Sequence, residues 1–509
     1  MDAKCIPFVY LCVDFSRVSP AARTIYIMYS SPVRISKSDI LNDNYRLRAR
    51  RERSFRSRMK KEEQQSAIGA RQYTFTLPNG LRIVCEERTA DVLYCGYIVK
   101  AGTRHEEDAD SGLAHFLEHL SFKGTARRSW QITNGLERVG GDLNAFTNKQ
   151  ETAFTAIVLR EDFTRAADLL TDIVFRSAYP QKEMDREVEV VCDEIDSYRD
   201  SPAELIFDEF EQLVYGDAPL GRDILGVPER LRTYTTADAI RFAKQHYTPK
   251  NAVFYVHGEV EMRTIIRQLE KWQNCKIVGS IEDSETLNAE PIEHFSIASK
   301  GELETNNDEI GNSGTTKEVK GAITPASPTV RRVNRGTHQA HVMMGGLTFG
   351  SDDERRFTLL LLNNILGGPA MNSRLNMAVR EKCGLVYSID AYLNTYPDTG
   401  FWNVYFGCDL EDVNRCCKLV ERELAKLAQH PLTPRQLHAA QEQLCGQIGI
   451  SGDNSESAAL AMAKQFAHFG TYRNISRLYK KIRNISAEQL QQLAKEIYRP
   501  EARYTLIYH

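Results

Sequence analysis

The sequence contains no apolar run long enough to cross a bilayer. A membrane helix needs about 18–20 consecutive apolar residues, and even the most apolar N-terminal stretch, Cys5 to Phe15, is shorter and contains Asp14. We therefore expect no membrane span. A basic excess is also absent, because 65 Lys and Arg stand against 68 Asp and Glu, for a formal charge of −3. Nothing in the body of the chain indicates nucleic acid as a partner.

Paired cysteine motifs are missing as well. The 11 cysteines are an odd number, they are scattered along the chain, and no two of them form a CxxC pair. This distribution argues against a disulfide framework and favours a reducing compartment.

Length and composition predict several segments. A chain of 509 residues exceeds one ordinary core, since domains usually span about 100–200 residues. Residues 279–330 are rich in Ser, Glu, Asn, Gly and Thr and lack periodicity, as expected for a flexible linker. We predict a disordered leader at 1–71, a first domain at 72–278, the linker at 279–330 and a second domain at 331–509.

The predicted leader has three interpretations. It ends in a basic stretch, Arg46 to Lys61, and Met59 opens a plausible native N-terminus. The first is a disordered extension, or a start assigned too early in the sequence. The second is a transit peptide, and the third is a nucleic-acid-binding arm. Acidic residues such as Asp2 and Asp14 count against the transit peptide, and the balanced charge of the body counts against the arm.

The two predicted domains repeat the same order of elements. A strand followed by a helix occurs at 153–174 and again at 402–424, and a capped helix followed by a terminal strand closes each domain, at 235–258 and 486–509. An internal duplication explains both repeats. Because strands and helices occur in runs with short hairpins, we predict an α+β fold of two duplicated domains, each a mainly antiparallel sheet packed against helices.

Individual elements follow from periodicity in the first domain. Alternating residues on both sides of Pro78-Asn79-Gly80 predict a hairpin from Gln72. We expect strands at 92–100 and 151–158, and helices at 112–122, 160–176 and 182–198.

The helix at 112–122 contains the pattern H-x-x-E-H. His115 and His119 are four residues apart, so one helix face can present both imidazoles to one ion. Glu118 lies beside them, and a carboxylate at that position can act as general base on the water of a catalytic zinc. Residue types and spacing together predict a zinc-dependent hydrolase.

A catalytic zinc needs a third protein ligand and an open fourth position. Glu187 and Glu194 are seven apart on the helix at 182–198 and therefore share a face. We choose Glu194 as the ligand, because it follows an apolar run that should anchor the helix. Glu187, two turns earlier, suits an orienting role behind a ligand.

With these residues, the chain resembles the inverted-motif zinc peptidase family of pitrilysin, insulysin and the mitochondrial processing peptidase β subunit. Besides HFLEH and the two glutamates, the resemblance rests on GDLNAFTNKQETAF at 141–154, PLGRDILG at 219–226 and LGGPAMNSRLNMAVREKCGLVYS at 366–388. It spans about 72–275 and 331–509, and it is strongest with the short, two-domain bacterial members.

The resemblance implies roles for further residues. Glu194 matches the third ligand of the family and Glu187 its supporting acid. Asn144, Ala145 and Phe146 match the segment that binds substrate along a sheet edge, while Arg380 and Tyr387 match the pair that approaches the scissile carbonyl, where both can donate hydrogen bonds to an oxyanion.

The implied protein is a metalloendopeptidase with one Zn²⁺ per chain that cleaves peptides or unfolded polypeptide. Family enzymes use four such domains to enclose substrate, so a homodimer is expected, in the bacterial cytoplasm or alternatively in the mitochondrial matrix. Three rivals remain open: a β-type processing subunit that needs a partner chain, a catalytically silent structural subunit, and a binding module with a structural zinc.

Overall fold

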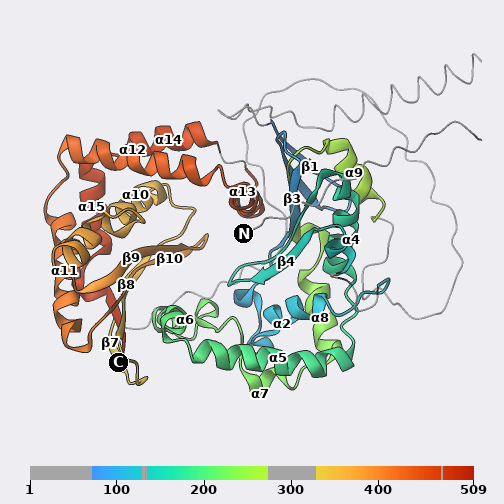
Figure 1. Cartoon of the computed structure of the whole chain (residues 1–509), viewed down its shortest axis with the longest axis horizontal. Helices are drawn as coiled ribbons and strands as arrows, with labels where there is room; N and C mark the ends of the chain where they lie inside the picture. Colours follow the sequence, from blue (N-terminus) through green and yellow to red (C-terminus); the bar gives the residue numbers. More distant parts are fainter. Residues whose placement is uncertain (1–70, 129–131, 133, 273–327, 472–473) are drawn as a thin grey trace, which may run out of the picture. The chain divides into compact units, whose positions relative to one another are not determined.

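The computed structural model describes residues 71–128, 132, 134–272, 328–471 and 474–509 (Figure 1). The predicted leader up to residue 70, Met59 included, and the predicted linker up to residue 327 lie outside the described residues. Arg71 and Val330, at the ends of those two segments, belong to strands β1 and β7.

The first sheet has six strands in the order β1-β2-β6-β3-β5-β4. They are β1 (Arg71–Thr76), β2 (Arg82–Glu87), β3 (Val92–Val99), β4 (Asp142–Thr147), β5 (Thr152–Leu159) and β6 (Ala252–His257). The predicted hairpin is confirmed, since β1 and β2 pair antiparallel with Arg71 opposite Glu87 and Thr76 opposite Arg82. Only β2 and β6 pair in parallel, so the sheet is mainly antiparallel.

The second sheet has five strands in the order β7-β11-β8-β10-β9. They are β7 (Val330–Val333), β8 (Ala340–Phe349), β9 (Val386–Thr395), β10 (Thr399–Cys408) and β11 (Arg503–Tyr508). One parallel pair, β7 with β11, again stands beside antiparallel pairs. Read from β2 and from β7, the two sheets have the same strand order and directions, which supports the predicted duplication.

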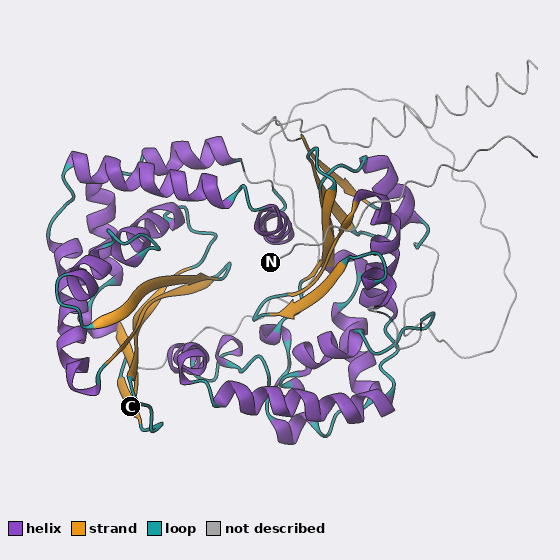
Figure 2. Cartoon of the chain, viewed as in Figure 1, coloured by secondary structure: helices purple, strands orange, loops and turns teal. Residues whose placement is uncertain are grey.

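Helices make up most of the remaining described chain (Figure 2). Before residue 273 they are α2 (Leu113–Ser121), α3 (Asn134–Glu137), α4 (Phe163–Arg176), α5 (Gln181–Arg199), α6 (Pro202–Tyr215), α7 (Pro228–Leu231), α8 (Thr236–His246) and α9 (Met262–Glu270). After residue 327 they are α10 (Arg356–Gly367), the π-helix η6 (Asn376–Glu381), α11 (Val413–Gln429), α12 (Pro434–Ser451), α13 (Ser455–Phe469), α14 (Ile475–Arg483) and α15 (Ala487–Ile497). The α+β prediction is confirmed.

The first sheet is covered on both faces, because successive strand residues point to opposite sides. Tyr97 belongs to the face of α4, where its hydroxyl lies 2.8 Å from Thr171 Oγ1. The next residue, Ile98, belongs to the opposite face and packs in one cluster with Ala463 and Phe466 of α13. A helix from the second half of the chain therefore covers the first sheet.

Helix α6 makes the reciprocal contact. Ile206 and Phe210 of α6 pack in one cluster with Met343, Phe401 and Leu506 of the second sheet. The opposite face of that sheet forms the large core with α10, α11 and α15. Each sheet thus takes one covering helix from the other half of the sequence.

Candidate metal centre

Helix α2 places two histidines one turn apart. The helix follows Gly112, whose φ of +81° is a left-handed conformation that glycine adopts without steric cost. Buried Leu113 and Leu117 anchor the helix in the core. The ring centroids of His115 and His119 lie 4.7 Å apart, as expected for positions i and i+4 on one face.

Helix α5 brings Glu194 to these rings from 75 residues further along the chain than His119. Glu194 Oε2 lies 3.4 Å from His119 Nε2 and 3.9 Å from His115 Nε2. Potential ligand atoms of the three residues all lie within 4.8 Å of one another, and in the described part of the chain no other group of three His, Cys, Asp or Glu residues meets this criterion.

The three side chains fit a catalytic zinc. Two imidazole nitrogens and one carboxylate oxygen are a usual zinc donor set, and a catalytic site keeps a further position for water or substrate. The Glu194 side chain is 44% exposed, so the group is open to solvent on that side. A structural site would instead close with four protein ligands.

Glu187 lies behind His119. Its Oε1 is 3.1 Å from His119 Nδ1, while its Oε2 is 2.6 Å from Lys123 Nζ. A carboxylate at Nδ1 accepts the ring proton there and directs the lone pair of Nε2 toward a metal. His115 Nδ1 is buried and has no hydrogen-bond partner among the described residues.

The two histidines differ in proton affinity. Burial, together with the neighbouring His119, lowers the pKa of His115 to about 4, so this ring is neutral at neutral pH. Burial also disfavours a charge on His119, but hydrogen bonds to Glu187 and Glu194 outweigh it and raise the pKa of His119 to about 9. A divalent cation at Nε2 would take the place of that proton.

Glu118 is buried beside the metal group. Thr147 Oγ1 donates a hydrogen bond of 2.6 Å to Glu118 Oε2, which fixes one carboxylate oxygen. Burial raises the pKa of Glu118 despite this bond. A cavity of about 280 Å³ opens beside it, lined by Glu118, His119, Phe122, Lys123, Leu143, Asn144, Ala145 and Glu187.

The predicted substrate segment is the outer strand of the first sheet. Asn144, Ala145 and Phe146 belong to β4, which pairs only with β5 and is the last strand in the sheet order. Asn144 and Ala145 line the cavity at Glu118. Phe146 packs toward α13, with Lys464 Nζ 4.9 Å from its ring centroid.

Arg380 and Tyr387 lie in the second half of the chain. Arg380 belongs to η6, and Tyr387 is the second residue of β9. Tyr387 is 90% exposed to solvent. Among the described residues, no hydrogen bond or ion pair joins either of them to the metal group or to Glu118, and the ion-pair contact of Arg380 is with Glu381.

Sequence patterns did not single out Thr147 or Lys123. Thr147 is the last residue of β4 and meets Glu118 only because the sheet edge runs beside α2. Lys123 follows α2 and meets Glu187 only because α5 packs on α2. Thr147 is the last residue of the GDLNAFT motif, and Lys123 lies four residues after His119 of H-x-x-E-H; these positions were the available signal.

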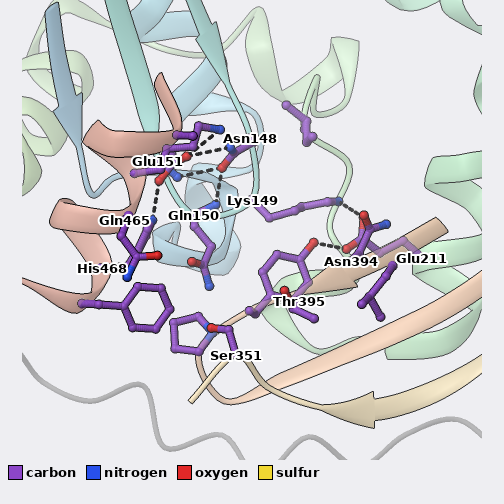
Figure 3. Close-up of a pocket in the computed structure, with 17 residues that line it drawn as sticks. Asn148, Lys149, Gln150, Glu151, Glu211, Ser351, Asn394, Thr395, Gln465 and His468 are labelled. Carbon is purple, nitrogen blue, oxygen red and sulfur yellow. Dashed lines mark hydrogen bonds and ion pairs between the residues drawn. The ribbon is translucent and has the colours of Figure 1, made fainter. Parts of the chain in front are cut away.

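A second cavity, of about 610 Å³, does not contain the metal group (Figure 3). Two of its carboxylates have partners. Glu151 lies 2.9 Å from Lys464 Nζ and also contacts His468, and these partners lower the pKa of Glu151 to about 2 although burial opposes them. Glu211 likewise accepts a hydrogen bond from Tyr396.

Comparison with known proteins shows the relationships of the chain. Residues 82–227 match the family model described as insulinase, peptidase family M16, and residues 233–444 match that of the peptidase M16 inactive domain. The metal group lies within the first match. The chain is 30% identical to the uncharacterized zinc protease YmxG of Bacillus subtilis, over 85% of this chain and 97% of that protein. An uncharacterized zinc protease of Streptomyces coelicolor is 31% identical over 83% of this chain and 86% of its own.

Solved structures agree on the fold. A protease from Helicobacter pylori superimposes with a TM-score of 0.72 at 19% identity, covering 86% of this chain and 99% of that one. A peptidase M16 inactive domain from Pseudomonas fluorescens gives 0.70 at 18% identity, covering 86% and 98%. None of the described helices is long and apolar enough to cross a membrane. With both halves matched in order and the relatives covered nearly end to end, the chain belongs to the M16, or insulinase, family of peptidases.

Proposed function

We propose that this chain is a zinc-dependent metalloendopeptidase that hydrolyses peptide bonds in peptides or unfolded segments. The observation that carries the proposal is the convergence of His115, His119 and Glu194, with Glu118 held next to them by Thr147. Membership of a peptidase family and relatives named as zinc proteases support the same reaction.

Each residue has a chemical task in this proposal. Zinc, when bound by the two imidazoles and Glu194, would supply Lewis acidity for the attacking water and the scissile carbonyl. Glu118 takes the proton of the water and later passes it to the leaving amine. Because Thr147 occupies Oε2, the oxygen that carries the proton is Oε1. A carboxyl group with a raised pKa suits both halves of this transfer.

We further propose that substrate adds to the free edge of β4. A peptide on a sheet edge gains main-chain hydrogen bonds with little dependence on its sequence, which suits unfolded segments. Asn144 and Ala145, next to the cavity at Glu118, would place the scissile bond. Arg380 and Tyr387 would donate hydrogen bonds to the oxyanion.

The proposed active form is a homodimer in the bacterial cytoplasm. The bacterial relatives favour this setting over the mitochondrial matrix. The chain contains both the complete metal group and the Arg380 and Tyr387 pair, so it does not need a second kind of chain to supply either. A silent structural subunit would have no reason to keep all three ligands, the base and Glu187 in register.

The first experiment compares Glu118→Gln with wild type for zinc content and for cleavage of a quenched peptide. We expect the variant to keep its zinc and to lose cleavage by at least about 10²-fold, because a general base contributes about 10²–10⁴-fold. Equal turnover would remove Glu118 from its role. Cleavage by the purified wild-type chain alone would also argue against a processing subunit that requires a partner.

Glu194→Gln tests the third ligand in the same assay. We expect loss of zinc, because the amide replaces an anionic oxygen donor. Asp193→Asn is the matched control, since Asp193 is the exposed preceding residue on the same helix and is not part of the metal group. Zinc retained at full affinity by Glu194→Gln would contradict the proposed ligand set.

A further inference from the structure

The segment Pro219–Gly226, with the sequence PLGRDILG, has no part in the mechanism above. It begins with the short helix η4 (Pro219–Gly221) and runs to Gly226. Along this course it contacts the loop from Glu106 to Gly112, which leads directly into α2. Since α2 carries two metal ligands and the base, anything that sets the start of α2 bears on all three.

Two glycines bring the backbones together at that point. Gly226 and Gly112 both have positive φ, +77° and +81°. A Cβ atom on Gly226 would lie 2.6 Å from Gly112 Cα and 2.9 Å from Ser111 O. Neither neighbour is a movable side chain. The two backbone segments can approach this closely only because both residues lack a side chain.

Arg222 adds polar contacts from the same segment. Its guanidinium donates to the backbone carbonyl of Glu106 and to the carboxylate of Asp108. Its own carbonyl accepts a hydrogen bond from Lys149 Nζ. Lys149 lies in the turn between β4 and β5 and is almost completely buried. The segment therefore contacts both the approach to α2 and the end of the proposed substrate strand.

Glu106 connects this loop to the helix itself. Its Oε2 accepts from Gly112 N at 3.1 Å and its Oε1 from Ala114 N at 2.8 Å. These are N–H groups at the start of α2 that no helical carbonyl can satisfy, so the two carboxyl oxygens of Glu106 serve as their acceptors. Burial raises the pKa of Glu106 to about 8, although these two hydrogen bonds oppose the shift. Only 5% of Glu106 is exposed, so water cannot easily replace it.

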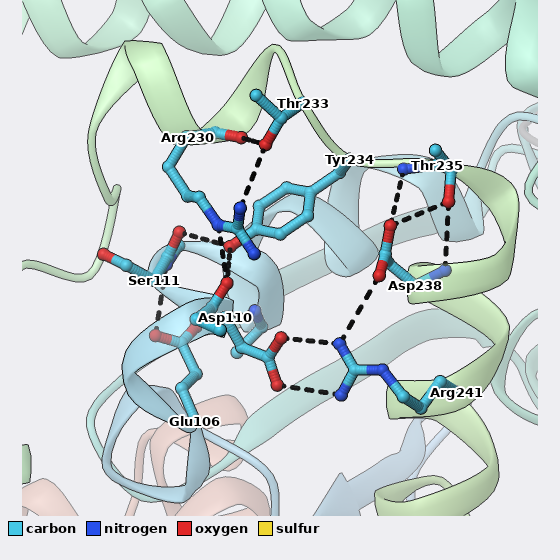
Figure 4. A network of polar contacts seen from close by, with 12 residues as sticks. Glu106, Asp110, Ser111, Arg230, Thr233, Tyr234, Thr235, Asp238 and Arg241 are labelled. Carbon is cyan, nitrogen blue, oxygen red and sulfur yellow. Dashed lines mark hydrogen bonds and ion pairs between the residues drawn. The ribbon is translucent and has the colours of Figure 1, made fainter.

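Side chains from the following elements hold the rest of the loop (Figure 4). Arg241 of α8 makes two hydrogen bonds to Asp110, at 3.0 and 2.6 Å. The Tyr234 hydroxyl donates to Ser111 O at 3.0 Å. Arg230 Nε donates to Ala109 O at 2.6 Å. The approach to α2 is thus fixed at nearly every residue.

We propose that Glu106, Arg222 and Gly226 are positioning residues that hold the N-terminal end of α2 so that His115, His119 and Glu118 meet Glu194 of α5 and the strand β4. The inference rests on the proposed zinc peptidase function. It assigns a role to PLGRDILG that involves neither substrate nor metal contact.

The test uses the full chain with Glu106→Gln, Arg222→Gln, Arg222→Lys and Gly226→Ala. Four quantities are measured for each: the zinc Kd by competition with a chelator, kcat and KM on a quenched peptide, and the temperature of unfolding. Glu106→Gln keeps the size of the side chain but replaces one acceptor oxygen with an NH2 group, which then faces one N–H of the helix. Gly226→Ala introduces the Cβ that the Gly112 backbone cannot accommodate.

We expect the zinc Kd to rise about tenfold or more in Glu106→Gln and Gly226→Ala. Substitutions of residues that support metal ligands typically weaken metal binding by about 10–100-fold, and this expectation is the lower end of that range. We also expect kcat to fall with KM little changed, and Arg222→Lys to recover part of the loss in Arg222→Gln. Gly336→Ala is the matched control, because Gly336 also has a positive φ, +64°, but an added Cβ there meets nothing within 4 Å. It should lower the unfolding temperature without changing the zinc Kd.

A lower unfolding temperature with unchanged zinc Kd and kcat in Glu106→Gln and Arg222→Gln would overturn the inference, since these residues would then be structural only. If Gly226→Ala does not fold, the other two variants decide. A wild-type chain that binds no zinc and cleaves no peptide marks a different failure, that of the proposed function itself.

Discussion

His105 and His246 are two partly buried histidines outside the metal group, with ring centroids 6.2 Å apart. Gly102 N donates to His105 Nδ1 at 3.2 Å, so the ring proton of neutral His105 is on Nε2. The His246 ring packs against Phe242 with a centroid distance of 4.4 Å. Burial is the main cause that lowers the pKa of both rings to about 4, and for His105 the nearby His246 adds to it.

This pair predicts a loss of stability in mild acid. A histidine whose pKa is lower in the folded state takes up its proton first in the unfolded state, so the free energy of unfolding falls as pH drops from about 6.5 to about 4. The slope reaches at most ~1.4 kcal/mol per pH unit for each histidine. We expect His246→Gln to flatten the slope in denaturant titrations between pH 7 and pH 4, carried out with a chelator so that metal release does not contribute.

The control for this prediction is His430→Gln, which changes an exposed histidine after α11 and should leave the slope as in wild type. Glu151 does not interfere. Its lowered pKa stabilises the folded state, and this stabilisation is lost only at more acidic pH, as pH falls from about 4.5 toward about 2. Parallel curves for wild type and His246→Gln would show that His246 is not held neutral by the fold.

At the scale of elements, local pattern predicted what depends on local spacing. The helices expected at 112–122 and 182–198 became α2 and α5 with ends shifted by one residue, and the hairpin formed around its Pro-Asn-Gly turn. The helix expected at 160–176 begins instead with a 3-10 turn, Arg160–Asp162, and is α-helical only from Phe163. His115, Glu118 and His119 could be found because one helix fixes their spacing.

Contacts between distant segments could not be read in the same way. Thr147 meets Glu118 across 29 positions, and Arg222 meets Glu106 across 116. The exchange of α6 and α13 between the sheets is the largest example, because an amphipathic helix does not encode which sheet it will cover. Apolar residues of α13 predict burial, but not burial on a sheet whose strands lie about 200–380 positions earlier.

Substitution on α13 tests this exchange. Ala463 is fully buried in the cluster that α13 forms with the first sheet. We expect Ala463→Leu to lower the free energy of unfolding by ~1–3 kcal/mol, the usual cost of extra methylenes in a packed core. Ala458→Leu, on the same helix at a partly exposed position, should cost much less. Equal small effects in urea unfolding would mean that α13 is not packed on the sheet in solution.

At the scale of the whole molecule, duplication gave two sheets of the same topology but unequal chemistry. The metal group and Glu118 belong to α2 and α5, beside the first sheet, whereas Arg380 lies on η6 and Tyr387 on β9 of the second sheet. One sheet edge, β4, lies beside the base, and the other, β9, begins with the exposed Tyr387. Covering so exposed an aromatic side chain with another surface would remove apolar area from water and stabilise the resulting contact.

Two large apolar side chains accompany Tyr387 in the segment 371–387, which includes η6 and the start of β9. They are Met371 and Met377, and both are exposed. Tyr392 is exposed as well, but it packs on Phe207. Single exposed apolar residues are ordinary, but a group within one segment indicates an interaction surface. Under the homodimer proposal, this segment is where the partner copy or the substrate would make contact.

We therefore predict a homodimer in light scattering at micromolar concentration, weakened by Met371→Asp. The Met371 side chain is 62% exposed, and placing a carboxylate at the centre of an apolar contact should raise the dimer Kd about tenfold or more, equal to ~1.4 kcal/mol. Ile450→Asp is the control, since Ile450 is even more exposed, at 78%, but lies on α12 outside the segment. If both variants remain dimeric to the same dilution, the segment does not form the interface; a wild-type chain that is monomeric and fully active would rule out the homodimer.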